Sequence, residues 1–155
     1  MQVSNSTIDE HLQLVTFLVG DHYLGIPLQG VQEINRNLTL TPVPNSSPIV
    51  SGVLNLRGEV VTVLDLKMMV FGEPTEIGEN TRNIVVNVQG ERVGVLVDRI
   101  VDVVSVDHSD LDDLPPNLEK SGRQFFQGVF QTERGLLTMF EIDEAVRESE
   151  GFEVG

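Results

Sequence analysis

The feature that most limits how this chain folds is an internal repeat that covers most of its sequence. Residues 17–34 align with residues 86–103 at an offset of 69, and residues 52–70 align with residues 128–146 at an offset of 76. The offset grows because the middle loop of the second copy is seven residues longer. Each copy has roughly 65–70 residues, and a unit of that size has only a thin core of its own. We therefore expect the two copies to pack together and fold as one unit.

Each copy contains short, β-branched segments separated by glycine turns, which is the pattern of β-hairpins. With residues 38–48, whose prolines favour an extended edge over a central strand, this makes about five strands per copy. The sequence therefore predicts an all-β protein built from two small barrels or sandwiches. The expected strands are 13–19, 23–28, 50–56 and 60–66 in the first copy, and 84–88, 92–97, 124–131 and 136–142 in the second.

Little helix is expected in this chain. Residues 66–71 predict one short turn of helix, and residues 143–150 predict a terminal helix with Asp143 as its N-cap. The first barrel is expected to span residues 12–78 and the second residues 79–150. The two ends, residues 1–11 and 151–155, are expected to be frayed.

The composition excludes several classes of function. The net charge is −14, and the ten Lys and Arg residues are scattered, whereas binding of phosphates needs clustered basic residues. We therefore expect no nucleic-acid partner. The chain has no apolar run long enough to cross a membrane and no secretory signal, so we expect a cytoplasmic protein without direct membrane insertion. It has no cysteine, which excludes disulfides and thiolate chemistry.

Residues suited to catalysis or metal binding are few. The three histidines, His11, His22 and His108, fall in an end, a turn and a loop. The acidic loop 107–113 lacks the central glycine and the closing glutamate of a calcium-binding loop. We therefore predict no catalytic residue, no metal site and no cofactor. A small-barrel enzyme or ligand-binding module stays open as a distant alternative, but its only repeat-equivalent acids, Asp65 and Glu141, are expected to lie far apart.

A set of aliphatic residues has two possible roles. These residues form either part of the core or an apolar groove that receives a partner helix, and the pattern alone favours the core. The set consists of Val15, Leu28, Val31, Ile34, Val97 and Ile100.

One tetrapeptide differs between the copies. Asn55-Leu-Arg-Gly58 meets Gln131-Thr-Glu-Arg134, although the neighbouring residues match. The difference indicates a functional role for the first turn, in which Arg57 offers a planar set of donors for a carboxylate. Glu33 is a candidate partner. Such a pair either ties a turn to a strand or takes part in an interface.

Several segments together resemble the CheW-type coupling proteins of bacterial chemotaxis. The resemblance covers about residues 12–148, and we therefore treat residues 1–155 as one CheW-like domain. It implies two intertwined five-stranded SH3-like barrels. The segments that carry it are Thr41-Pro-Val-Pro44, Gly52-Val-Leu-Asn-Leu-Arg-Gly58, Val63-Leu-Asp-Leu66 and Val93-Gly-Val-Leu-Val-Asp98.

The resemblance implies a non-enzymatic adaptor with two partners, recruited to membrane-associated receptor arrays. One partner is the cytoplasmic tip of a chemoreceptor, a helical hairpin, and the other is the regulatory domain of a CheA-type histidine kinase. The implied receptor groove is formed by Val15, Leu28, Val31, Ile34 and Ile100. The implied ion pair is Glu33 with Arg57, and the implied kinase surface lies near Leu40, Val43, Pro44 and Gly58. An adaptor in a pilus-motility or other non-flagellar pathway is an alternative with the same fold.

Overall fold

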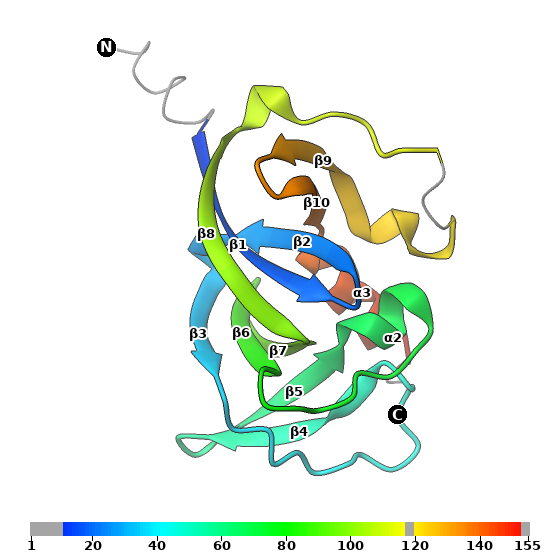
Figure 1. Ribbon diagram of the computed structural model, residues 1–155. Helices are drawn as coiled ribbons and strands as arrows, with labels where there is room; N and C mark the ends of the chain where they lie inside the picture. Colours follow the sequence, from blue (N-terminus) through cyan, green and yellow to red (C-terminus); the bar gives the residue numbers. More distant parts are fainter. Residues whose placement is uncertain (1–10, 117–119, 153–155) are drawn as a thin grey trace.

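The computed structural model describes residues 11–116 and 120–152, and these form two five-stranded sheets (Figure 1). The chain order of strands and α-helices is β1 (His11–Val19), β2 (His22–Pro27), β3 (Val31–Asn35), β4 (Val50–Leu56), β5 (Glu59–Asp65), α2 (Leu66–Phe71), β6 (Arg82–Val88), β7 (Glu91–Val97), β8 (Arg99–Asp107), β9 (Phe126–Thr132), β10 (Gly135–Phe140) and α3 (Ile142–Phe152). Three 3₁₀ turns add η1 (Leu28–Gly30), η2 (His108–Asp110) and η3 (Lys120–Phe125). The all-β prediction with a short helix at 66–71 and a C-terminal helix is confirmed.

The two sheets exchange strands between the two halves of the chain. One sheet has the order β8-β1-β2-β10-β9, and the other has the order β3-β6-β7-β5-β4. Replacing each strand of the first sheet by its repeat counterpart reproduces the order of the second, so the repeat in the sequence is a pseudo-two-fold repeat in the fold. The ranges 12–78 and 79–150 therefore describe the two copies of the repeat, while each sheet takes strands from both ranges.

The largest core lies between the sheets and follows the same symmetry. Fully buried Phe17 and Val86 occupy equivalent positions in it, as do Leu64 and Phe140. Helices α2 and α3 contribute Val70 and its counterpart Val146. Each sheet also surrounds a small core of its own, around Leu54 and Val85 in one and around Leu14 and Phe130 in the other. The two halves therefore bury their largest set of apolar residues against each other.

Two repeat-equivalent glycines allow a crossing segment to approach each sheet. Thr41 forms an isolated bridge with Val53 beside Gly52, where an added Cβ would lie 2.6 Å from the Thr41 carbonyl oxygen. A Cβ on Gly128 would likewise collide with the carbonyl oxygen of Asp112, which bridges to Val129. The Gly-Val pairs of the repeat therefore have a structural cause, which is close backbone contact.

The structure corrects several predicted elements. The fifth strand of the first copy is β3, whereas residues 38–48 form no strand beyond the bridge at Thr41. Strand β8 is nine residues long and was not predicted. Helix α3 begins at Ile142, and η3 occupies the start of the strand expected at 124–131.

The ends expected to be frayed lie partly outside the described residues. Residues 1–10 and 153–155 are not described, but His11 already belongs to β1 and α3 extends to Phe152.

Candidate functional site

The tetrapeptide that distinguishes the first copy forms a two-residue hairpin turn. Leu56 pairs with Glu59, so Arg57 and Gly58 are the two loop residues, and both have positive φ, at 52° and 84°. This combination defines a type I′ turn. The Asn55 side chain accepts a hydrogen bond from the Gly58 N–H over 3.1 Å and closes the turn.

The same turn recurs elsewhere in the chain, which separates structural from functional residues. Between β6 and β7, Gln89 and Gly90 also have positive φ, and Asn87 accepts a hydrogen bond from the Gly90 N–H over 3.0 Å. Asn and Gly in the tetrapeptide are therefore explained by turn geometry. Arg57, like Gln89, has a left-handed backbone that favours Gly or Asn, so the turn geometry does not explain why this residue is an arginine.

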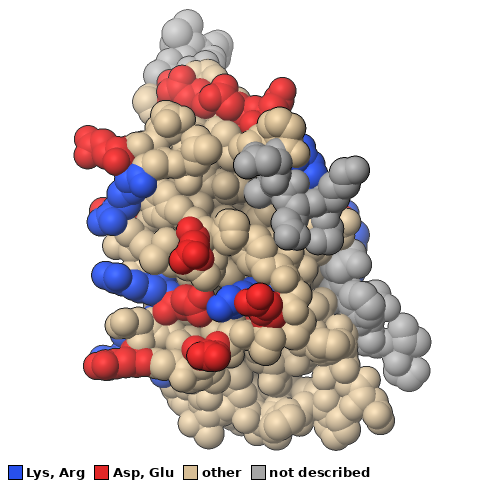
Figure 2. All heavy atoms as spheres, turned by 45° about the vertical axis from the view of Figure 1, so that its right-hand side comes forward, with Lys and Arg blue, Asp and Glu red and all other residues tan. Residues whose placement is uncertain are grey.

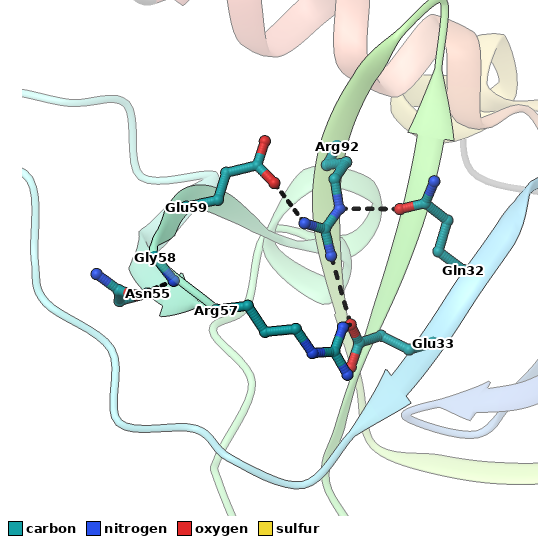
Figure 3. Close-up of polar contacts among 7 residues, drawn as sticks. All are labelled: Gln32, Glu33, Asn55, Arg57, Gly58, Glu59 and Arg92. Carbon is teal, nitrogen blue, oxygen red and sulfur yellow. Dashed lines mark hydrogen bonds and ion pairs between the residues drawn. The ribbon is translucent and has the colours of Figure 1, made fainter.

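Arg57 points along the surface toward Glu33 of β3 (Figure 3). Its Nη1 donates to Glu33 Oε2 over 2.9 Å, so the structure places these two predicted residues in contact. The Arg57 side chain is 77% exposed, while that of Glu33 is 22% exposed. An exposed pair of this kind contributes only about 0–1 kcal/mol to stability.

A second arginine, Arg92 of β7, also contacts the carboxylate of Glu33. Arg92 Nη2 lies 3.4 Å from Glu33 Oε2, Nε donates to Gln32 Oε1 over 2.9 Å, and Nη1 donates to Glu59. Its side chain is only 20% exposed. The two arginines thus approach Glu33 from different elements, Arg92 from β7 and Arg57 from the β4–β5 turn (Figure 3). Arg92 was not predicted from the sequence, because its repeat counterpart is Tyr23 and no motif surrounds it.

The equivalent end of the other sheet lacks this network. Tyr23, Asp102 and Glu133 occupy the positions of Arg92, Glu33 and Arg57. There the side chains leave a hollow of about 620 Å³, lined by Tyr23, Asp102, Arg134 and their neighbours. The hydroxyl of Tyr23 is buried without a hydrogen-bond partner among the described residues. The two ends of the molecule therefore share a backbone plan and differ in their charged chemistry.

The residues predicted for the kinase surface lie along β4, at the edge of its sheet. Leu40 is half-buried and packs against the core of that sheet, while Val43 and Pro44 are exposed. The bridge between Thr41 and Val53 holds this segment beside β4. Gly58 is exposed at the tip of the β4–β5 hairpin. The set thus combines a loop segment bridged to the edge strand β4 with the tip of the β4–β5 hairpin.

The residues predicted for the receptor groove divide into buried and accessible ones. Val15 is 1% exposed and belongs to the shared core, so it leaves no surface for a partner. Leu28, Val31 and Ile100 are half-buried and pack against the same core. Ile34 is 43% exposed and is paired in register with buried Ile84. The four accessible residues therefore surround one margin of the shared core.

This margin runs between the edge strands β3 and β8. In Figure 1 both strands lie on the left of the molecule, and α2 and α3 lie on its right. The helices therefore cover a different side of the shared core from the one at β3 and β8. On β8, Val103 is 47% exposed, and it is the repeat counterpart of Ile34. Val103 was missed in the sequence analysis, although the offset of 69 from Ile34 would have identified it.

A hollow of about 780 Å³ adjoins this margin at Leu28. It is lined by residues from β1, from the segment that ends β2 and enters η1, and from β8. Leu12, Pro27 and Leu28 supply its apolar surface, and Gln13 and Ser105 are among its polar residues. We use the name seam groove for a set of accessible aliphatic residues of η1, β3 and β8, which are Leu28, Val31, Ile34, Ile100 and Val103.

In the part of the chain that the structure describes, no group of three potential ligands could hold a metal ion. Asp65 is 5% exposed, and its carboxylate accepts hydrogen bonds from the backbone of Met68 and from both donors of Thr75. It therefore caps α2. In the acidic loop, hydrogen bonds from the Ser109 hydroxyl and backbone lower the pKa of Asp107 below its ordinary value.

The surface charges are interspersed. On the face shown in Figure 2, Lys and Arg side chains lie beside Asp and Glu side chains instead of gathering alone. In the described residues, no helix is long and apolar enough to cross a membrane.

These features define a double-barrel protein with an exposed arginine at one hairpin and an apolar seam between its sheets. The model of the CheW-like domain matches residues 13–150, which is most of the chain. The chain therefore belongs to the CheW-like family, and the resemblance found in the sequence is confirmed.

Individual relatives agree with this assignment. The chain is similar to the chemotaxis protein CheW of Treponema pallidum, with 31% identity over 138 residues that span 86% of this chain and 81% of the relative. It is also similar to protein FrzA of Myxococcus xanthus, with 39% identity over 103 residues that span 66% of this chain and 62% of the relative. A crystal structure of the scaffolding protein TtCheW from Thermoanaerobacter tengcongensis has the same fold, with a TM-score of 0.75, 23% identity and 83% coverage of each chain.

Proposed function

We propose that this protein is a non-enzymatic adaptor that couples the cytoplasmic tips of chemoreceptors to a CheA-type histidine kinase. The observation that carries the proposal is that the chain belongs to the CheW-like family, whose domain matches residues 13–150. We assign the two partners to two surfaces of the double barrel. The first surface is the Arg57 hairpin with the segment beside β4. The second is the seam groove between β3 and β8.

The chemistry of the seam groove suits an apolar helix. Its residues are aliphatic, and they are accessible at the margin of a well-packed core, so the groove is rigid before a partner binds. A helix presents apolar side chains at a spacing of three and four residues, which fits an elongated aliphatic groove. The tip of a chemoreceptor is a helical hairpin of this kind.

The chemistry of the hairpin suits a polar interface. Arg57 is 77% exposed, and the structure shows it bonded to Glu33 alone among the described residues. Its remaining donors are available to acceptors on a partner. Val60 of the same hairpin is 65% exposed and supplies apolar area beside the charge. An arginine next to apolar surface is a common centre of binding energy in protein interfaces.

Coupling then follows from holding two partners in fixed positions. The adaptor supplies binding free energy that links receptor and kinase, and it needs no chemical step. The proposal places the protein in the cytoplasm beside the receptor tips. An adaptor in a different motility pathway would use the same surfaces with other partners, and the similarity to FrzA is the observation that keeps this second candidate.

The experiment is titration calorimetry against two reagents from the same organism, a kinase regulatory domain and a receptor-tip fragment. We expect Arg57→Asn to weaken binding of the kinase domain and not of the receptor fragment, because Asn keeps the left-handed turn and removes the guanidinium. We expect Ile34→Ser to weaken binding of the receptor fragment and not of the kinase domain. Arg134→Asn and Ile77→Ser are matched controls, since each makes the same change at an exposed residue outside the two surfaces. If the folded protein bound neither reagent, chemotaxis coupling with these partners would be rejected.

A further inference from the structure

Arg92 and Arg57 share one carboxylate but differ in accessibility. Arg92 is 20% exposed, and its guanidinium donates to Gln32, Glu59 and Glu33. Arg57 is 77% exposed and donates to Glu33. The donors of Arg92 are therefore used within the protein, and those of Arg57 are largely open to solvent. Arg92 is therefore suited to hold Glu33 in place, and Arg57 is suited to contact a partner.

The support joins the two halves of the chain. Arg92 lies on β7 in the second copy, and its three partners lie on β3 and β5 in the first. Strand β7 pairs in parallel with β5 and antiparallel with β6, which in turn pairs with β3. Arg92 therefore spans the sheet to reach β3 across β6. The backbone of Glu33 pairs with Val85 of β6, and its carboxylate accepts from Arg92 as well as from Arg57.

We infer that Arg92 is a positioning residue for the kinase-binding hairpin: it fixes Glu33 and, through Glu33, the direction of Arg57. A free arginine side chain loses rotamer freedom when a partner immobilises it. Holding Arg57 in advance lowers that cost and strengthens binding without a new contact. At the equivalent end of the other sheet Tyr23 replaces Arg92, so the contacts of Arg92 with Glu33 have no counterpart there. The use assigned to the orientation rests on the proposed function.

The first test uses the free protein. We expect Arg92→Gln to lower the ¹⁵N relaxation order parameter of the Arg57 Nε–H group, because Glu33 loses its support. Arg92→Lys keeps the charge without the planar set of donors, and it should give an intermediate value. Arg82→Gln is the matched control, since Arg82 lies in the same sheet and donates to carbonyl oxygens of residues 79 and 81. An unchanged order parameter in folded Arg92→Gln would overturn the inference.

The second test is a double-mutant cycle on kinase-domain affinity. Arg92→Gln alone should lower the affinity for the kinase domain about tenfold, which is within the range of coupling energies measured between neighbouring residues. In an Arg57→Asn background the same change should have no more than about a twofold effect, because nothing remains to be positioned. Affinity for the receptor fragment should stay unchanged. Losses that multiply, or an equal loss of receptor affinity, would overturn the positioning role and indicate a general structural one.

The two tests separate this inference from the proposed function. If wild type failed to bind the kinase domain, the proposed function would fail. The order parameter of Arg57 would still decide whether Arg92 positions it.

Discussion

Replacing Asn83 by Leu should stabilise the protein. Asn83 is fully buried in the core of its sheet, and neither its amide nitrogen nor its amide oxygen has a hydrogen-bond partner among the described residues. Its repeat counterpart is Leu14, also fully buried. Gly94, diagonally across from Asn83, makes room for its side chain as Gly25 does for Leu14. The fold therefore already accommodates a leucine at this position in one copy.

The magnitude follows from the environment. A buried polar group without a partner costs about 1–3 kcal/mol. Leu and Asn have the same branching, so the steric penalty should lie at the low end of the roughly 1–3 kcal/mol typical of overpacking. We expect Asn83→Leu to raise the free energy of unfolding by about 1 kcal/mol, which corresponds to an increase in Tm of about 2–4 °C for a chain of this size.

The assay is chemical denaturation followed by circular dichroism, with a thermal scan for Tm. The reciprocal variant Leu14→Asn is the control, and it should destabilise the protein because it places an amide in an apolar core. A lower midpoint for Asn83→Leu would refute the reasoning. It would mean that the amide of Asn83 forms hydrogen bonds in solution that the leucine removes.

Two further predictions concern backbone contact and pH. Gly128→Ala should destabilise the protein by about 1–3 kcal/mol, because the new methyl group meets the Asp112 carbonyl; denaturation midpoints test this, and an unchanged midpoint would contradict it. The pKa of Asp107 should lie below its ordinary value and rise in Ser109→Ala, as followed by NMR titration. A lowered pKa means that the charged form is favoured in the folded protein. The associated stability is therefore present above the unfolded-state pKa and is lost as pH falls through the folded-state pKa.

The architecture could be predicted because it is encoded locally and twice. Alternating apolar residues and glycine turns identified both hairpins of each copy, and the repeat indicated a shared core. Strands β3 and β8 were missed because half-buried edge strands carry a weak apolar pattern. Both strands contain only partly buried and exposed residues, which alternate in β3 and follow no regular order in β8. Exchange of strands between the halves is a property of long-range pairing, which no local pattern reports.

The candidate site was predicted only in part. The pairing of Arg57 with Glu33 was found because the copies differ at the tetrapeptide. Val15 was placed in the groove by resemblance, whereas the structure buries it in the shared core. Arg92 was missed because its three partners are brought together by the sheet, across gaps of 33 to 60 positions in sequence.

The repeat also shows how to separate function from folding at one turn. A difference between the copies first suggested that the whole tetrapeptide is functional. The turn at Asn87–Gly90 shows that Asn and Gly serve the same backbone geometry elsewhere, so these two residues need no functional explanation. Arg57 remains, held at a φ of 52° that Gly or Asn would adopt at lower cost. Gln89 has a φ of 53° at the same position of its turn, so the backbone accepts other residues there and does not explain the choice of arginine. Arg57 is exposed and shares Glu33 with Arg92, and it is the residue of this turn through which we propose contact with a partner.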